Sequence, residues 1–190
     1  MNKRLMKFAM ALTLIFGAVA VHNTDVDAQQ IKPYYKWSGY IGYSYKFLLD
    51  SKFRKALIND NVTINGMKVA TNFNNDDIRE GLNAFEQLHN KRQYNKRYVN
   101  KQFDTFGYKS LQGKYFLIEL PVQKGKLTMK KFDQHYGNYK IGTNVIKNKS
   151  GKVIERTVTY RTKKGIFEAN FNAKNKLIDC YIAANITTAY

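Results

Sequence analysis

Three segments near the end of the chain alternate apolar and polar residues with a period of two, which is typical of half-buried β-strands. They cover residues 152–162 (KVIERTVTYRT), 165–172 (GIFEANFN) and 175–187 (NKLIDCYIAANIT), and short turns join them. The pattern predicts a three-stranded antiparallel meander with one apolar face and one wet face. Because helices must cover the apolar face, we expect an α+β fold with two to three helices packed on that face.

Apolar residues with helical spacing predict those helices in three places. The segments are residues 47–58, 74–93 and 126–137. We expect Asn75 or Asp76 to cap the second helix, and Thr128 to cap the third, which Gly137 ends. Residues 113–122 (GKYFLIELPV) are expected to form a strand that ends at Pro121. Asn65-Gly66, between two short apolar runs, predicts a tight hairpin turn.

The first 28 residues have the pattern of a secretory signal peptide. A basic start (MNKRLMK) precedes fourteen apolar residues, and small residues stand before Gln29. This predicts cleavage after Ala28 and a single mature domain at residues 29–190, secreted to the extracellular space. An uncleaved N-terminal anchor is the alternative.

The mature chain begins with an arm, residues 29–45, that holds six aromatic residues and two glycines. The glycines argue against a helix, so we expect an extended or looped arm. Its rings either form an exposed stacking surface or pack over the core with their hydroxyls in water. Half of them are expected to pack.

One cysteine, Cys180, occurs in the whole chain. A secreted protein with one thiol has no internal disulfide framework, so packing alone must stabilise it. Since Cys180 alternates with Ile178 and Ile182, we expect a buried core residue and not a reactive thiol.

Charge is the main indication of function. The chain has 32 Lys and Arg against 14 Asp and Glu, a net charge of +18. Removal of residues 1–28 leaves 29 cationic and 12 acidic residues, a net charge of +17. Such a charge favours nucleic acid, other polyanions, anionic surfaces or acidic proteins as partners. The alternative is that the charge only keeps the protein soluble.

The densest basic segment is residues 89–101 (HNKRQYNKRYVNK), where cations alternate with tyrosines. The cations would neutralise phosphates and the tyrosines would stack on bases. Cations at a helix end also complement the helix dipole, and one of the tyrosines is expected to pack on the core. The predicted nucleic-acid-binding residues, here and in later basic clusters, are Lys91, Arg92, Tyr94, Lys96, Arg97, Tyr98, Lys101, Lys130, Lys131, Arg161, Lys163 and Lys164.

Motifs of catalysis are not found in the sequence. No serine stands in a nucleophile-elbow context, and no glycine-rich loop has phosphate-binding spacing. His89 and His135 have no partners at metal-ligand spacing. Asp76 and Asp77 are better explained as charges at a helix N-terminus. We therefore expect no enzyme activity, no catalytic residues, no metal and no cofactor.

The N-terminal half of the mature chain resembles the immunodominant staphylococcal antigen B family. The resemblance rests on PYY at 33–35, GYIG at 39–42, FLLD at 47–50 and DNVTINGMKVA at 60–70, and more loosely on LTMKKFDQHYG at 127–137. It implies a secreted basic protein, found in the medium and at the cell surface, that binds nucleic acid without sequence preference. It carries over no contact residues.

Two functions follow as hypotheses. The first is a secreted binder of extracellular nucleic acid without sequence specificity. The alternative is a protein held non-covalently at the cell surface by anionic wall polymers, or one that binds a host protein through the aromatic arm. These hypotheses differ in the expected salt dependence of binding, which is steep only for a polyanion ligand.

Overall fold

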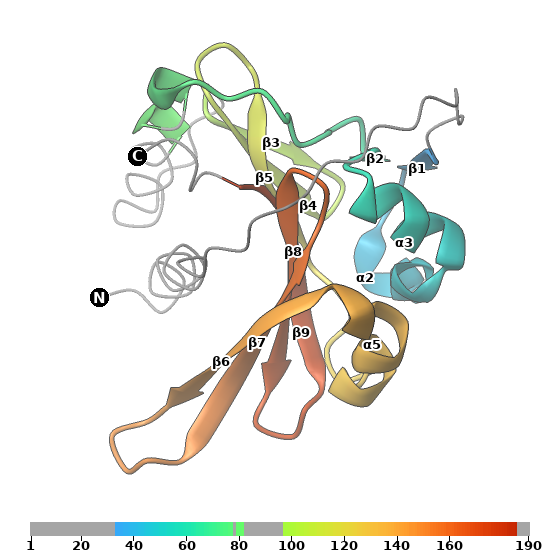
Figure 1. Cartoon of the computed structure of the whole chain (residues 1–190), viewed down its shortest axis with the longest axis vertical. Coiled ribbons are helices and arrows are strands. Elements are labelled where there is room, and N and C mark those ends of the chain that lie inside the picture. Colours follow the sequence, from blue (N-terminus) through green and yellow to red (C-terminus); the bar gives the residue numbers. More distant parts are fainter. Residues whose placement is uncertain (1–32, 78, 82–96, 186–190) are drawn as a thin grey trace, which may run out of the picture.

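The computed structural model describes residues 33–77, 79–81 and 97–185. These residues form an α+β fold, as expected, with one large antiparallel sheet and most of the helical residues on one side of it; the short helix that begins at residue 75 lies apart from them (Figure 1). The predicted signal peptide, most of the second predicted helix, and Lys91, Arg92, Tyr94 and Lys96 lie outside the described residues.

The predicted meander is confirmed, but the sheet is larger. It has seven strands in the order β3-β4-β5-β9-β8-β7-β6. The three predicted strands are β7 (Val153–Arg161), β8 (Gly165–Asn172) and β9 (Leu177–Ala184). β6 (Lys140–Lys147), which was not predicted, pairs with β7 at the edge. It is mostly exposed, so burial imposes no period of two on its sequence.

The other half of the sheet comes from residues 99–120. β5 (Tyr115–Leu120) is the predicted strand, and it pairs with β9 in the centre. No strands were predicted between residues 97 and 112, but β3 (Val99–Gln102) and β4 (Thr105–Lys109) form a hairpin there. Both strands are too short to show a clear alternation.

The first predicted helix is interrupted. A helical turn α2 (Ile41–Ser44) and a 3-10 helix η1 (Tyr45–Leu49) precede α3 (Ser51–Ile58). Asp50 breaks the run because its side chain accepts a 2.7 Å hydrogen bond from the Lys52 N–H and so caps α3.

The expected looped arm is only partly correct. β1 (Tyr35–Trp37) pairs in parallel with β2 (Val62–Ile64), and the arm then enters α2. Helix formation at Gly42 is supported by Asp104, whose carboxylate accepts the Ile41 and Gly42 N–H groups at 2.9 and 2.8 Å. The ring expectation is confirmed: Tyr35, Trp37 and Tyr45 pack against the core, whereas Tyr34, Tyr40 and Tyr43 are exposed.

The Asn65-Gly66 turn is confirmed. Both residues have positive φ, 51° and 78°, and Ile64 and Met67 exchange two backbone hydrogen bonds of 2.8 Å. The predicted hairpin is reduced to this single bridge, because β2 pairs with β1 instead.

Two further helix ends test the predicted caps. Thr128 caps α5 (Met129–Tyr136) through the Lys131 N–H, and Gly137 ends it, as expected; η2 (Gly137–Tyr139) follows. At the other helix, which begins at residue 75, the cap is Asn74 and not Asn75 or Asp76. Asn74 and Asp77 exchange two hydrogen bonds. The Asp77 N–H donates to the Asn74 side chain at 2.8 Å, and the Asn74 N–H donates to the Asp77 carboxylate at 3.2 Å.

The main core lies between the sheet and α2, α3 and α5, which Figure 1 shows on the same side of the sheet. Aromatic rings fill it; Phe132 of α5 contacts Phe167 and Phe171 with ring centroids 6.3 and 5.5 Å apart. Cys180 is fully buried in this core, as predicted.

The expectation of a wet second face is wrong for much of the sheet. Leu117, Ile166 and Ala183 form part of a second buried cluster there. The polar residues of this face are also buried and bond across strands: Thr157 donates to Asn170 at 2.7 Å, and Asn170 donates to Asp179 at 2.6 Å. The alternation of polar and apolar residues therefore separates the two faces of the sheet correctly, but it does not predict whether the polar face is exposed to water.

Candidate nucleic-acid interface

The β7–β8 turn, residues 161–165, carries three of the predicted cations on a firmly held backbone. Lys163 donates its N–H to the Ile58 carbonyl at 2.8 Å, and Lys164 donates its N–H to the Asp60 carboxylate at 2.6 Å. Thr162 donates its hydroxyl to the same carboxylate and accepts the Gly165 N–H. The turn is thus fixed to the end of α3 while the Arg161, Lys163 and Lys164 side chains remain exposed.

Asp60 can reach the turn because the chain reverses after α3. Its φ is 53°, in the left-handed region, which Asp and Asn occupy more readily than most residues. Its own N–H closes the helix end on the Leu57 carbonyl at 3.0 Å. One carboxylate therefore joins two segments about a hundred residues apart in the chain.

The turn forms a ridge between two open grooves, with Lys163 lining both. The first groove, of about 450 Å³, runs between the turn and residues 59–72, and Lys68 and Lys164 also line it. The second, of about 610 Å³, runs between the turn and residues 138–141. Its side chains include Tyr139, Lys140 and Arg161.

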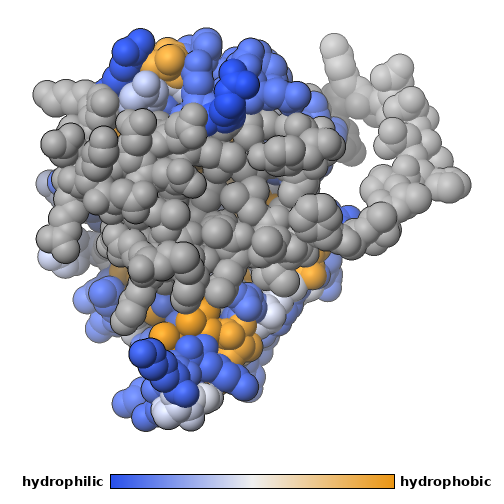
Figure 2. Space-filling view, turned by 90° about the vertical axis from the view of Figure 1, so that its left-hand side faces the viewer, coloured by the Kyte–Doolittle hydropathy of each residue, from blue (hydrophilic) through white to orange (hydrophobic). Residues whose placement is uncertain are grey.

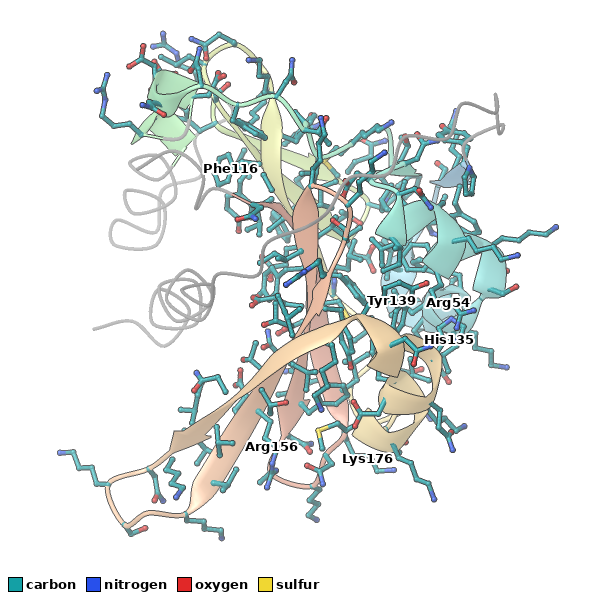
Figure 3. All side chains as sticks on the ribbon, in the orientation of Figure 1. Arg54, Phe116, His135, Tyr139, Arg156 and Lys176 are labelled. Carbon is teal, nitrogen blue, oxygen red and sulfur yellow. The ribbon has the colours of Figure 1, made fainter. Side chains whose placement is uncertain are left out.

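A hydrogen bond joins α3 to α5, the two helices whose C-terminal ends lead into the second groove. The Arg54 guanidinium donates to the His135 carbonyl at 2.7 Å, and Tyr139 follows α5 close by (Figure 3). Tyr139 is 37 % exposed, so a ring stands in a groove lined by cations. This combination suits a base beside its phosphates.

Sequence reasoning missed Lys68, Tyr139 and Lys140 as members of this site. Lys68 follows the Asn-Gly turn, and Tyr139 and Lys140 follow α5, so no local cluster marks them. Lys140 also forms a 3.2 Å ion pair with Asp133. The contact of the end of α3 with the β7–β8 turn brings Lys68 to the first groove, and the pairing of Lys140 with Tyr160 brings Tyr139 and Lys140 to the second.

Residues 97–101 are the part of the predicted basic segment that the structure describes. Tyr98 is half-buried against the second cluster, with the Arg97 guanidinium 6.0 Å from its ring centre, so it is not a free stacking surface. Lys101 is exposed, with its ammonium 5.4 Å from the Phe106 ring centre. The expectation that one tyrosine of the pair packs on the core is confirmed for Tyr98.

Strand register brings two of the predicted clusters to one end of the sheet. Successive pairs join Val99 to Arg161 in one cross-strand row, through Tyr108, Leu117, Ala183 and Ile166. Five strand spacings separate the ends of this row, roughly 24 Å. Arg97, Tyr98 and the β7–β8 turn therefore share the end of the sheet where this row lies.

Lys130 and Lys131 are not part of this arrangement. They lie in the first turn of α5, and Thr128 forms a bridge with Lys176 beside the β8–β9 turn, at the opposite end of the sheet. Figure 3 shows Lys176 and Arg156 at that end, where the Arg156 guanidinium donates to the Ala173 carbonyl at 3.3 Å. The predicted basic clusters thus do not form one patch.

Most of the coloured surface in Figure 2 is hydrophilic. A small apolar area lies low on this face, at the height where Figure 1 places the far ends of β6 to β9. The visible surface beside the described strands is therefore mainly polar.

Asp77 has a structural role. Its side chain is buried and forms a 2.7 Å ion pair with Lys114. Burial by itself raises the pKa of Asp77, but hydrogen bonds from Lys114, the Asn74 N–H and Ser110 together hold it below the usual value. The carboxylate therefore stays ionised and fastens the helix start to the β4–β5 turn.

Glu168 is a buried carboxyl group with a raised pKa. Burial, with a smaller contribution from Asp179, raises its pKa to about 7, although the Thr159 hydroxyl donates to it at 3.0 Å. Glu168 lines neither groove. Its place is in the polar rows of the second sheet face.

Within the described ranges, no three His, Cys, Asp or Glu side chains gather closely enough to hold a metal ion. No helix in the same residues is long and apolar enough to cross a membrane.

The fold and its surface define a small, strongly basic α+β domain. Residues 34–182 match the family model described as immunodominant staphylococcal antigen B. The chain therefore belongs to the immunodominant staphylococcal antigen B family, as the resemblance indicated.

Curated relatives carry the same description. Proteins named immunodominant staphylococcal antigen B from Staphylococcus aureus strains USA300, NCTC 8325 and COL are each 40 % identical to this chain over 65 residues. The match covers 32 % of this chain and 37 % of each relative, so it spans little more than a third of their length. No solved structure matches.

Proposed function

We propose that this protein is a secreted member of its antigen family that binds extracellular nucleic acid without sequence specificity. Residues 1–28 act as the signal peptide and residues 29–190 are the mature domain. The observation that supports binding most strongly is the β7–β8 turn, on which three exposed cations stand between two open grooves. The comparisons support the family and its antigen character, and binding rests on charge and geometry.

The turn suits a phosphate backbone for a physical reason. Backbone contacts to Ile58 and Asp60 fix its position, so the backbone of the turn loses little conformational entropy when its side chains meet an anion. Contacts from such cations to phosphates would carry no sequence information. Binding of this kind depends on the spacing of charges and releases counterions, so it is independent of sequence and sensitive to salt.

The span of the interface agrees with this ligand. The cross-strand row from Arg161 to Val99, beside Arg97, spans roughly 24 Å, the length of about seven base-pair steps along a duplex axis. Lys91, Arg92, Tyr94 and Lys96, which precede Arg97 in the chain, are proposed to bind nucleic acid on the grounds of their sequence alone. Lys130 and Lys131 would serve as a separate, weaker contact.

Fluorescence anisotropy tests the proposal. Labelled duplex DNA, single-stranded DNA and RNA are titrated with the protein at several salt concentrations, with heparin as competitor. We expect micromolar or tighter binding to nucleic acid at physiological ionic strength, with heparin a poorer ligand at equal charge. Equal affinity for heparin would instead mean that the positive charge serves to bind polyanions in general, such as anionic wall polymers.

A further inference from the structure

Three aromatic rings are exposed where α2 meets the β3–β4 turn. Tyr40 is 57 %, Tyr43 84 % and Phe103 41 % exposed. Tyr40 and Phe103 lie edge to face with ring centroids 5.3 Å apart. We call these three residues the ring platform.

The platform is held on a fixed backbone. The Asp104 carboxylate accepts the Ile41 and Gly42 N–H groups, and the Gly42 carbonyl accepts the Gln123 N–H at 3.1 Å. A Cβ on Gly42 would lie 3.3 Å from the Asp104 carboxylate, a tight contact that would require the carboxylate to shift by a few tenths of an ångström. The backbone that carries Tyr40 and Tyr43 is therefore held in place without a ligand, which lowers the entropic cost of binding one.

Phe103 stands where the local backbone disfavours it. Gln102 pairs with Thr105, so Phe103 and Asp104 form a two-residue hairpin loop. The φ of Phe103 is 54°, and Asp104 is not among the described residues with positive φ, as in a type II′ turn, whose first loop position favours glycine. A bulky residue with positive φ is an outlier whose strain points to a role for the side chain.

The surroundings of the platform are cationic. Lys101 lies two residues before Phe103, Lys46 one helical turn after Tyr43, and Lys124 next to Gln123; all three side chains are exposed. Rings flanked by flexible cations match a ligand with flat faces joined by anions. A nucleic-acid strand with unpaired bases has this chemistry, because every base has a face that stacks and every link carries a charge.

We propose that the ring platform is a stacking site for unpaired bases, so that the protein prefers single-stranded regions of the nucleic acid it binds. This inference rests on the proposed function and adds a second contact to it. The β7–β8 turn holds phosphates of any strand, whereas the platform needs bases that are free of a duplex.

Two probes with the same number of phosphates separate these contributions. One is a labelled oligothymidylate, and the other is the same strand with an abasic site at every position. We expect the thymidine strand to bind about tenfold more tightly, the size of effect that loss of one stacking contact produces. Phe103→Gly, and separately Tyr40→Ser with Tyr43→Ser, should remove this difference.

Phe103→Gly is the sharpest variant, because glycine suits the turn. Its melting temperature should be unchanged or higher while its base preference is lost, which a merely damaged fold would not show. Tyr34→Ser, which removes an exposed ring outside the platform, should keep the preference.

The outcomes separate this inference from the proposed function. Equal affinity for the two strands, each still better than heparin, would overturn the platform alone and leave the rings to a protein partner. A base preference that survives Phe103→Gly and the double tyrosine variant would also overturn it. Binding of neither strand would overturn both proposals.

Discussion

The Asp60 carboxylate accepts the Lys164 N–H at 2.6 Å and thereby joins the end of α3 to the β7–β8 turn. The same carboxylate accepts the Thr162 hydroxyl. Charge-assisted hydrogen bonds are the strong ones, and Asn tolerates the same backbone conformation. Asp60→Asn should therefore lower the free energy of unfolding by about 1–3 kcal/mol in urea denaturation.

Asp76→Asn provides the control for that substitution. Asp76 pairs with Arg79 at 2.7 Å, but both side chains are exposed, so its loss should change stability by less than about 0.5 kcal/mol. Equal effects of the two substitutions would mean that Asp60 does not fix the turn.

Gly165 begins β8 with no room for a side chain. A Cβ there would lie 2.5 Å from the backbone carbonyl of Ala183, which cannot move without disturbing the β8–β9 pairing. Gly165→Ala should lower the free energy of unfolding by about 1–3 kcal/mol or more. Gly137→Ala, where a Cβ meets no atom within 4 Å, should change it little, so thermal melting of the two variants should differ clearly.

Burial of Glu168 predicts a stability that falls as pH rises. Its folded-state pKa is about 7 against an ordinary value of 4.5, so between these pH values the folded state keeps a proton that the unfolded state has lost. Stability is fully present below pH 4.5 and declines until about pH 7, by on the order of 2–3 kcal/mol.

Glu168→Gln should remove this decline and raise the free energy of unfolding at pH 8 relative to the natural protein. Urea denaturation at pH 5 and pH 8 measures both values, with Glu80→Gln, a half-exposed carboxylate, as control. A pH dependence unchanged by Glu168→Gln would show that other groups control it.

Burial also predicts the behaviour of the single thiol. Cys180 is fully buried, and burial raises the pKa of its thiol well above the usual value. A thiol reagent should label the native protein only as fast as it unfolds, and urea should accelerate labelling in step with the unfolding transition. Rapid labelling of the native state would contradict the buried position.

The local features of the sequence predicted local structure well. Thr128 and Gly137 delimit α5, and the Asn65-Gly66 turn forms as expected, because capping and turn formation depend on neighbouring residues. The three alternating strands were predicted because each shows the period of two within its own residues. The exposed edge strand β6 and the short strands β3 and β4 were not predicted, although each pairs with a strand next to it in the chain. Exposure of β6 and the shortness of β3 and β4 leave no clear period of two in their sequences.

The candidate site could be predicted only in part. Arg161, Lys163 and Lys164 stand together in the sequence, and the turn keeps them together in space. Lys68 comes near them because Asp60 joins the end of α3 to the turn, a contact between residues that no local pattern connects. Tyr139 comes near them because β6, a strand that was not predicted, pairs with β7. The strained backbone of Phe103 could not be predicted from the sequence, because the β3–β4 turn in which it lies was not predicted.

The salt dependence of nucleic-acid binding tests the central claim most directly. Two triple variants that remove the same charge are compared with the natural protein: glutamine at Arg161, Lys163 and Lys164, and glutamine at Lys147, Lys149 and Lys152 around the distant β6–β7 turn. If the β7–β8 turn holds phosphates, the first variant should lower the slope of log affinity against log salt by about 2–3, whereas the second should leave it nearly unchanged. Equal changes in the two variants would contradict a defined interface and would mean that binding follows net charge alone.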